Sequence, residues 1–183
     1  TFLREYSKWD KRDFPLSVYI PLPDEKKYNI NDPEHFRDMT KNAFLGWQNK
    51  IPEIVQFKFV NNEKEAKVVV RWSEYFEHQD YWGLAQSIPY KNNPNRKQRC
   101  YIDLAVRAQP GWYSDKPIFF GDEMFMNIAT HEMGHALSLD HGPDLNGAVY
   151  ATARSEASIT TRDINTLKKM YSVPIGYQFL CDL

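Results

Sequence analysis

The sequence has no excess of charge of either sign and no long apolar run. Its 23 lysines and arginines are balanced by 24 aspartates and glutamates, for a formal net charge of −1. A nucleic-acid-binding surface normally carries a clear excess of basic residues, so we expect no nucleic-acid partner. The mean hydropathy is −0.63, and no apolar stretch approaches the roughly 18 residues that cross a bilayer. We therefore expect no membrane span.

Cysteine and histidine are both scarce. Cys100 and Cys181 are the only cysteines. Two are too few for a disulfide scaffold, and their spacing excludes a Cys-x-x-Cys metal pair. A single disulfide between the tail and a strand, or two free thiols, are both open at this point. The five histidines are unevenly placed, because three of them lie between positions 131 and 141.

The periodicity of apolar residues predicts one α+β domain over residues 1–183, with residues 172–183 as a C-terminal tail. Helical spacing follows a capping Asn-Asp-Pro start and predicts a helix over 33–49. A second helix begins near Asp122 and includes His131 and His135, and a third begins at a capping threonine near 160. The polar segment 91–99 predicts a surface loop. Alternating or β-branched stretches predict five strands, at 16–20, 55–59, 66–72, 83–88 and 100–106.

The segment 131–141 reads HEMGHALSLDH and carries the chemistry of a metal site. Positions i and i+4 project from one face of a helix, so His131 and His135 can hold one ion between them. Neutral imidazoles suit Zn²⁺. Glu132 follows the first histidine, where its carboxylate can accept a proton from a water instead of binding the ion. The alternative is a surface helix with two incidental histidines.

A third ligand requires the chain to reverse direction after His135. In a continued helix, His141 would lie about 9 Å further along the axis and could not reach the same ion. Glycine would allow a left-handed turn at position 138 without steric cost, but this sequence has Ser138. We expect a strained turn at Ser138 that brings His141 to the metal. Glu156, which lies 21 residues after His135, is the alternative third ligand.

These residues resemble the HExxHxxGxxH zinc motif of metzincin proteases, above all its matrixin form. Upstream, MFMNIATHEMGHAL is similar to the matrixin active-site helix, and the segments IVQFKFV, AKVVVRW and SITTRDINTLKKMY also resemble the family. The resemblance spans about residues 14–172. It implies a metzincin-like catalytic domain with a twisted, mixed five-stranded sheet, two long helices and a C-terminal helix.

The resemblance implies a zinc-dependent endopeptidase that hydrolyses peptide bonds of protein or peptide substrates. His131, His135 and His141 would bind one catalytic Zn²⁺ ion, and Glu132 would be the general base. The resemblance also implies an exported, extracellular protein, which we expect to be a monomer.

Further site residues follow from the same resemblance. Gly83, Leu84 and Ala85 would lie on an edge strand above the cleft, where a peptide substrate can bind by strand addition. Their alternative is an ordinary interior strand. Tyr150 would donate a hydrogen bond to the tetrahedral intermediate, and its alternative is a packing role.

The sequence also departs from the matrixin pattern. Ser138 replaces the motif glycine, and Val149 stands where the family has the methionine of its Met-turn. Only His35 and His78 remain for the family's second, structural zinc site, so we expect a single zinc ion. Ca²⁺ sites stay open, with Asp103 near a family carboxylate position. The departures at positions 138 and 149 motivate an alternative function, a catalytically inactive pseudoprotease that binds zinc and protein.

Overall fold

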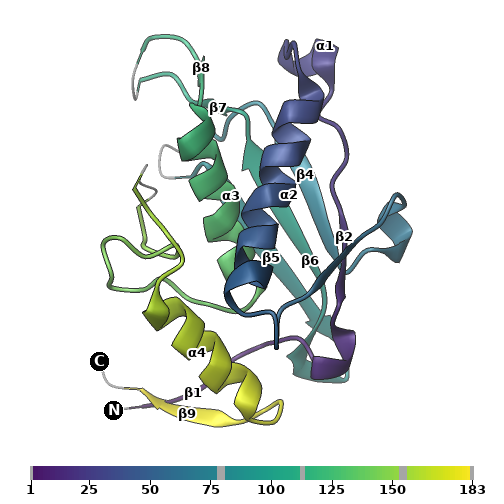
Figure 1. The fold of residues 1–183 in the computed structure, drawn as a ribbon, viewed down its shortest axis with the longest axis vertical. Helices are drawn as coiled ribbons and strands as arrows, with labels where there is room; N and C mark the ends of the chain where they lie inside the picture. The colour runs from purple at the N-terminus through teal and green to yellow at the C-terminus, as the bar shows by residue number, and fades with distance from the viewer. Residues whose placement is uncertain (1, 78–80, 112–113, 153–155, 182–183) are drawn as a thin grey trace.

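The fold is built on a mixed five-stranded sheet, which the computed structural model describes within residues 2–77, 81–111, 114–152 and 156–181. The strands lie in the order β3-β2-β4-β6-β5 (Figure 1). Neighbours among the first four strands run parallel, whereas β5 runs antiparallel to β6 and forms one edge. The predicted fold class is confirmed. The strand bounds are β2 (Leu16–Tyr19), β3 (Phe57–Phe59), β4 (Val68–Ser73), β5 (Gly83–Tyr90) and β6 (Asn93–Ala105).

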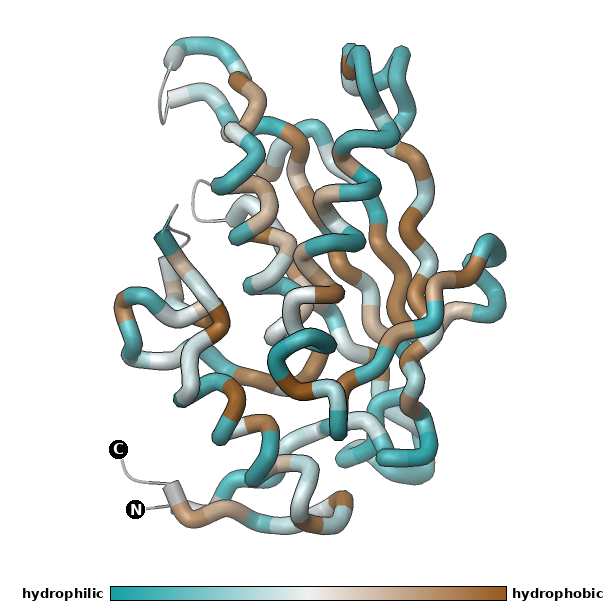
Figure 2. The backbone as a smooth tube through the Cα atoms, viewed as in Figure 1, coloured by the Kyte–Doolittle hydropathy of each residue, from teal (hydrophilic) through white to brown (hydrophobic). Residues whose placement is uncertain are grey.

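Two long helices, α2 (Pro33–Lys50) and α3 (Asp122–Ala136), lie side by side on one face of this sheet (Figure 1). The start of α2 is the predicted one, because the Asp32 side chain accepts a hydrogen bond from the His35 backbone N–H at 3.0 Å. Trp47 of α2 is fully buried and donates to the Thr130 carbonyl of α3 at 2.9 Å. Apolar residues are concentrated in the sheet and on the helix faces that cover it (Figure 2). These contacts hold α3 in place against the sheet.

The predicted C-terminal helix is α4 (Thr161–Ser172), which lies near the lower ends of α2 and α3 in Figure 1. Strand β9 (Gln178–Cys181) follows it. Strand β9 pairs antiparallel with β1 (Phe2–Glu5), so the two ends of the chain form a two-stranded ribbon beside α4 (Figure 1). From the sequence we expected only a C-terminal tail over residues 172–183, without this strand pairing. The remaining short elements are η1 (Lys11–Asp13), α1 (Glu25–Tyr28), η2 (Glu63–Glu65), β7 (Arg107–Ala108) and β8 (Ile118–Phe119).

One sequence prediction was wrong: the segment 91–99 is mostly strand and not a surface loop. Strand β6 begins at Asn93 and forms a hairpin with β5, interrupted by irregular register near Pro89. The reason lies in tertiary contacts, because Lys97 is only 3% exposed and its ammonium group is used inside the protein. Cys100, further along β6, is a buried free thiol, so it forms no disulfide with Cys181.

No helix in the described ranges is both long and apolar enough to cross a membrane.

We expect Thr160→Ala to destabilise the protein by about 1 kcal/mol, because Thr160 forms the capping box of α4. Its hydroxyl accepts from the Asp163 N–H at 3.3 Å, and the Asp163 carboxylate accepts from the Thr160 N–H at 2.9 Å. Denaturant unfolding measures the difference. Thr166→Ala, on the exposed side of the same helix, is the matched control and should be neutral or slightly stabilising. Equal effects of the two variants would contradict the capping role.

Candidate active site

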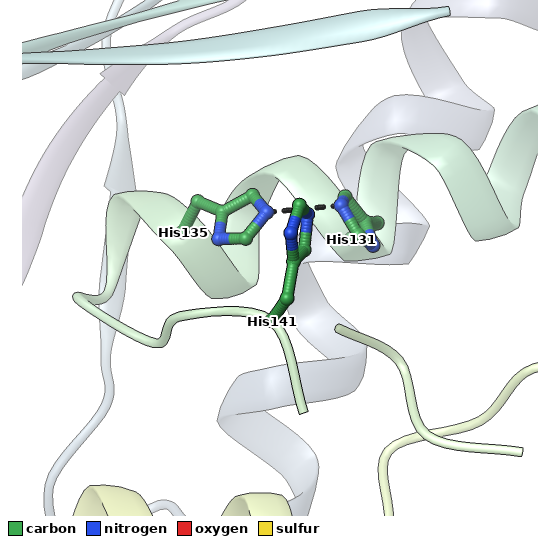
Figure 3. A group of neighbouring side chains, drawn as sticks. All are labelled: His131, His135 and His141. Carbon is green, nitrogen blue, oxygen red and sulfur yellow. Dashed lines mark hydrogen bonds between the residues drawn. The ribbon is translucent and has the colours of Figure 1, made fainter. Parts of the chain in front are cut away.

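Helix α3 presents His131 and His135 on one face, with their Nε2 atoms 2.9 Å apart (Figure 3). Buried apolar side chains elsewhere on the helix anchor it, among them Phe125, Ile128 and Met133. The predicted i and i+4 geometry is therefore realised by a helix whose orientation is set by core packing.

The chain turns sharply at Ser138, which has a left-handed φ of 86°. Backbone hydrogen bonds close the turn, from Ser138 N–H to the His135 carbonyl at 2.9 Å and from Leu139 N–H to the Gly134 carbonyl at 3.0 Å. The turn brings the His141 ring to 5.3 Å from the His131 ring and 4.8 Å from the His135 ring, centre to centre. The strained turn expected from the sequence is confirmed.

Backbone carbonyls set the tautomers of the first two histidines. The Nδ1 atom of His131 lies 2.9 Å from the Ala148 carbonyl, and that of His135 lies 2.7 Å from the Leu139 carbonyl. A carbonyl oxygen only accepts, so each Nδ1 carries the proton and donates it. Each Nε2 then offers a lone pair toward the common centre.

This arrangement fits a zinc ion. Two lone pairs facing each other at 2.9 Å repel unless a cation lies between them. A tetrahedral zinc ion with nitrogen bonds of about 2.0–2.1 Å holds neighbouring nitrogens about 3.3 Å apart, close to the observed spacing. The coordinating nitrogens of the three histidines lie within 4.8 Å of one another. Within the described ranges, no other set of three His, Cys, Asp or Glu side chains comes together in this way.

Burial keeps two of these imidazoles neutral, which is the form that binds a metal. Loss of solvent lowers the pKa of His131 to about 3, and the neighbouring His135 lowers it further. Burial likewise lowers the pKa of His135. Protons therefore do not compete for these two sites near neutral pH.

The Glu132 side chain lies in the contact between α3 and β5. Its side chain is nearly buried, and this burial raises its pKa to about 8, although a hydrogen bond from the Ala85 backbone lowers it. Gly83 provides the space for this side chain. A Cβ atom at position 83 would come within 2.6 Å of Glu132 Cγ and 2.7 Å of Oε1.

The predicted substrate-binding residues Gly83, Leu84 and Ala85 all lie on β5, directly beside Glu132. Strand β5 has β6 on one side only and is the last strand of the sheet. These residues therefore lie on an edge strand, and the alternative that they lie on an interior strand is wrong. Their contact with a substrate stays a prediction.

The matrixin family model matches residues 9–172 of this chain. The chain belongs to the matrixin family. Among curated matrixin relatives, rat macrophage metalloelastase is 22% identical over 176 residues, which cover 92% of this chain and 34% of the relative. Human matrix metalloproteinase-16 is 23% identical over 182 residues, which cover 91% of this chain and 28% of the relative. The chain thus spans about a third or less of the length of these relatives.

Val149, which the resemblance matches to the methionine of the Met-turn, is buried beside α3. Val149 is 2% exposed and packs against α3, so closely that a Cβ atom at Gly134 would lie 2.5 Å from Val149 Cγ1. The neighbouring Tyr150 is bridged to Gly142, the residue after the third histidine. This pairing holds Tyr150 next to the residue that follows His141. Its role in catalysis stays a prediction.

Other candidate residues do not join the histidine cluster. Glu156 is exposed and is absent from the group that the structure brings together, so His141 takes its place as the third member. His35 instead pairs with Asp122 at 3.0 Å, which links the starts of α2 and α3. Asp103 is bound by both ends of the Arg71 guanidinium, at 2.6 and 2.7 Å. His78 lies outside the described residues.

Two buried residues that support this site escaped the sequence analysis. Lys97 donates to the last carbonyls of α3, at 3.1 Å to His135 and 2.9 Å to Ala136, and burial lowers its pKa to about 8. Asp163 accepts from the Ala148 N–H at 3.3 Å and so fixes the residue whose carbonyl orients His131. The capping pattern around Thr160 could have revealed Asp163, but nothing in the polar stretch around Lys97 marks it as buried.

We expect Ser138→Gly to stabilise the metal-free protein by about 0.5–1 kcal/mol. A left-handed backbone costs serine about 1–2 kcal/mol that glycine avoids, and part of this gain is lost to the larger entropy of the unfolded glycine chain. Denaturant unfolding in the presence of a chelator measures the change. Ser87→Gly, at an exposed position of β5, is the control and should lower the free energy of unfolding. A destabilised Ser138→Gly variant would show that the turn is not strained.

Proposed function

We propose that this matrixin is a zinc-dependent endopeptidase, with His131, His135 and His141 as the zinc ligands. The observation that supports this most strongly is the pair of Nδ1–H donations to backbone carbonyls, because it directs Nε2 lone pairs at one point. The ion, when bound, lowers the pKa of a water molecule and polarises the scissile carbonyl.

Glu132 is the general base in this proposal. Its carboxylate accepts the proton of the attacking water and passes it to the leaving amine, so no covalent intermediate with the protein is needed. A carboxylate whose pKa is raised to about 8 by burial can both take up and release a proton near neutral pH. Glu132 contacts Gly83 and Ala85 of β5, which supports a base that acts on a peptide bound to that strand.

The edge strand β5 holds the substrate in this proposal. A peptide that adds to its free edge forms main-chain hydrogen bonds with Gly83, Leu84 and Ala85, which tolerate many substrate sequences. Tyr150 donates to the oxyanion of the tetrahedral intermediate. The substrate is a protein or peptide, and residues 1–183 act as a single, monomeric and exported catalytic domain with one zinc ion. Calcium is an additional candidate ligand.

A second candidate function is a zinc-binding pseudoprotease that binds protein without cleaving it. Ser138 and Val149, which differ from the matrixin pattern, motivate this alternative. The retention of Glu132 in a buried position favours the enzyme, because an ionisable side chain held in an apolar contact is costly unless it is used.

Zinc content and cleavage of casein, an unstructured protein, test the proposal. Wild type should bind one zinc per chain and cleave casein in a chelator-sensitive way. Glu132→Gln should keep the zinc and lose at least about 100-fold in rate, whereas His141→Ala should lose the zinc. Glu123→Gln, in the exposed first turn of α3, is the matched control and should behave as wild type. Zinc-loaded wild type without cleavage would favour the pseudoprotease.

Gly83→Ala should lower kcat about ten-fold or more with little change in KM or zinc content. The added Cβ meets Glu132 at 2.6–2.9 Å and forces its carboxyl group to another position, and a displacement of about 1 Å is enough to impair proton transfer. Gly121→Ala is the matched control, because an added Cβ there has no neighbour within 4 Å. Unchanged kcat in Gly83→Ala would exclude the proposed position of the base.

A further inference from the structure

A pocket of about 810 Å³ adjoins the histidine cluster. Its walls come from α4, from the segment 138–143, from Tyr6 and from strand β9. His141 lines the pocket and also belongs to the histidine cluster, so the two sites adjoin. This volume is typical of ligand sites and exceeds what a single small ion occupies.

One wall of the pocket carries positive charge that nothing in the described structure neutralises. Arg162 and Lys169 both line it and are exposed on α4. They are seven residues apart, which places them on the same face of the helix, about 10 Å apart along its axis. Neither forms an ion pair with any described residue. The acidic residue of the pocket, Asp140, is already paired with Arg4 at 2.9 Å.

A second, apolar wall is provided by Tyr6 and by strand β9 of the ribbon. Tyr6 and Phe179 pack edge to face with their ring centres 5.7 Å apart, and both line the pocket. Leu180 of β9 also lines it, and 73% of its surface is exposed. An exposed leucine in a pocket that two aromatic residues also line indicates a surface that gains from contact with another molecule. Both strands of the ribbon lie outside residues 9–172, the range that the family model matches.

We propose that this pocket is an exosite that binds an acidic segment of the substrate polypeptide containing apolar side chains. Carboxylates of the segment lie against Arg162 and Lys169, while its apolar side chains contact Leu180 and the rings of the ribbon. The segment reaches the pocket past His141, so one polypeptide occupies the cleft and the exosite together. This inference rests on the proposed endopeptidase function and adds a substrate class to it, proteins with acidic-apolar segments near the cleavage site.

Two sets of quenched fluorescent peptides test the exosite. All share one core sequence, chosen from a mapped casein cleavage site, and carry at either end the extension Asp-Phe-Glu-Leu-Glu or its neutral counterpart Asn-Phe-Gln-Leu-Gln. At low salt, one acidic extension should raise kcat/KM about five-fold over its neutral counterpart, through KM, as two exposed ion pairs allow. The advantage should fall in 0.5 M NaCl, because salt screens exposed charges.

The double variant Arg162→Gln/Lys169→Gln should lose this advantage and keep wild-type activity on the neutral peptide. Lys168→Gln is the matched control on the same helix, because Lys168 pairs with Glu53 at 2.9 Å and does not line the pocket. Equal cleavage of acidic and neutral peptides by wild type, at both ends, would overturn the exosite. So would an acidic advantage that persists in the double variant.

A binding measurement separates failure of the exosite from failure of the proposed enzyme. Fluorescence anisotropy with the labelled acidic extension alone, on zinc-loaded Glu132→Gln protein, should show binding that the double variant loses and Lys168→Gln keeps. Such binding by a wild-type protein that cleaves nothing would support the pocket and overturn the endopeptidase. If the protein cleaves casein but shows no preference for the acidic peptide in the cleavage assay or in the anisotropy assay, the exosite alone would be overturned.

Discussion

Two backbone carbonyls, those of Leu139 and Ala148, accept the Nδ1 protons of His135 and His131, and the geometry of the site depends on these two bonds. The Leu139 carbonyl is in position because the chain turns left-handed at Ser138. The Ala148 carbonyl is in position because Asp163 of α4 binds the N–H of the same residue. Each histidine is therefore oriented by a different part of the fold, and the cluster that could hold a metal ion depends on α3, the turn and α4 together.

Strand β5 contacts Glu132 and is also the proposed substrate-binding strand. Gly83 leaves the space that the Glu132 side chain fills, and the backbone of Ala85 provides its hydrogen-bond donor. In the proposed endopeptidase, the base is thus held by the same strand on which a peptide would lie. Such an arrangement couples the placement of the reacting bond to the placement of the base, because both refer to one rigid strand.

The departures expected from the matrixin pattern are accommodated by packing, and the three histidines still come together. Ser138 adopts the backbone conformation that glycine takes more cheaply, and three closely spaced backbone hydrogen bonds around the end of α3 hold it there. Val149 fills the space beneath α3 that Gly134 leaves open, so an apolar contact remains where the family has a thioether. Buried Lys97 adds a cation at the last carbonyls of α3, where it satisfies acceptors that the helix leaves unpaired.

The sequence by itself determined the features that repeat locally: the helix over 33–49, the five strands of the sheet, and the histidine spacing of HEMGHALSLDH, which required a turn at Ser138. It did not reveal that residues 93–99 are strand or that the two chain ends pair, because β-pairing joins residues distant in sequence. It also could not show that Lys97 is buried or that carbonyls of residues 139 and 148 orient the histidines. Backbone atoms are identical at every position, so only the tertiary structure decides which of them meets a given side chain.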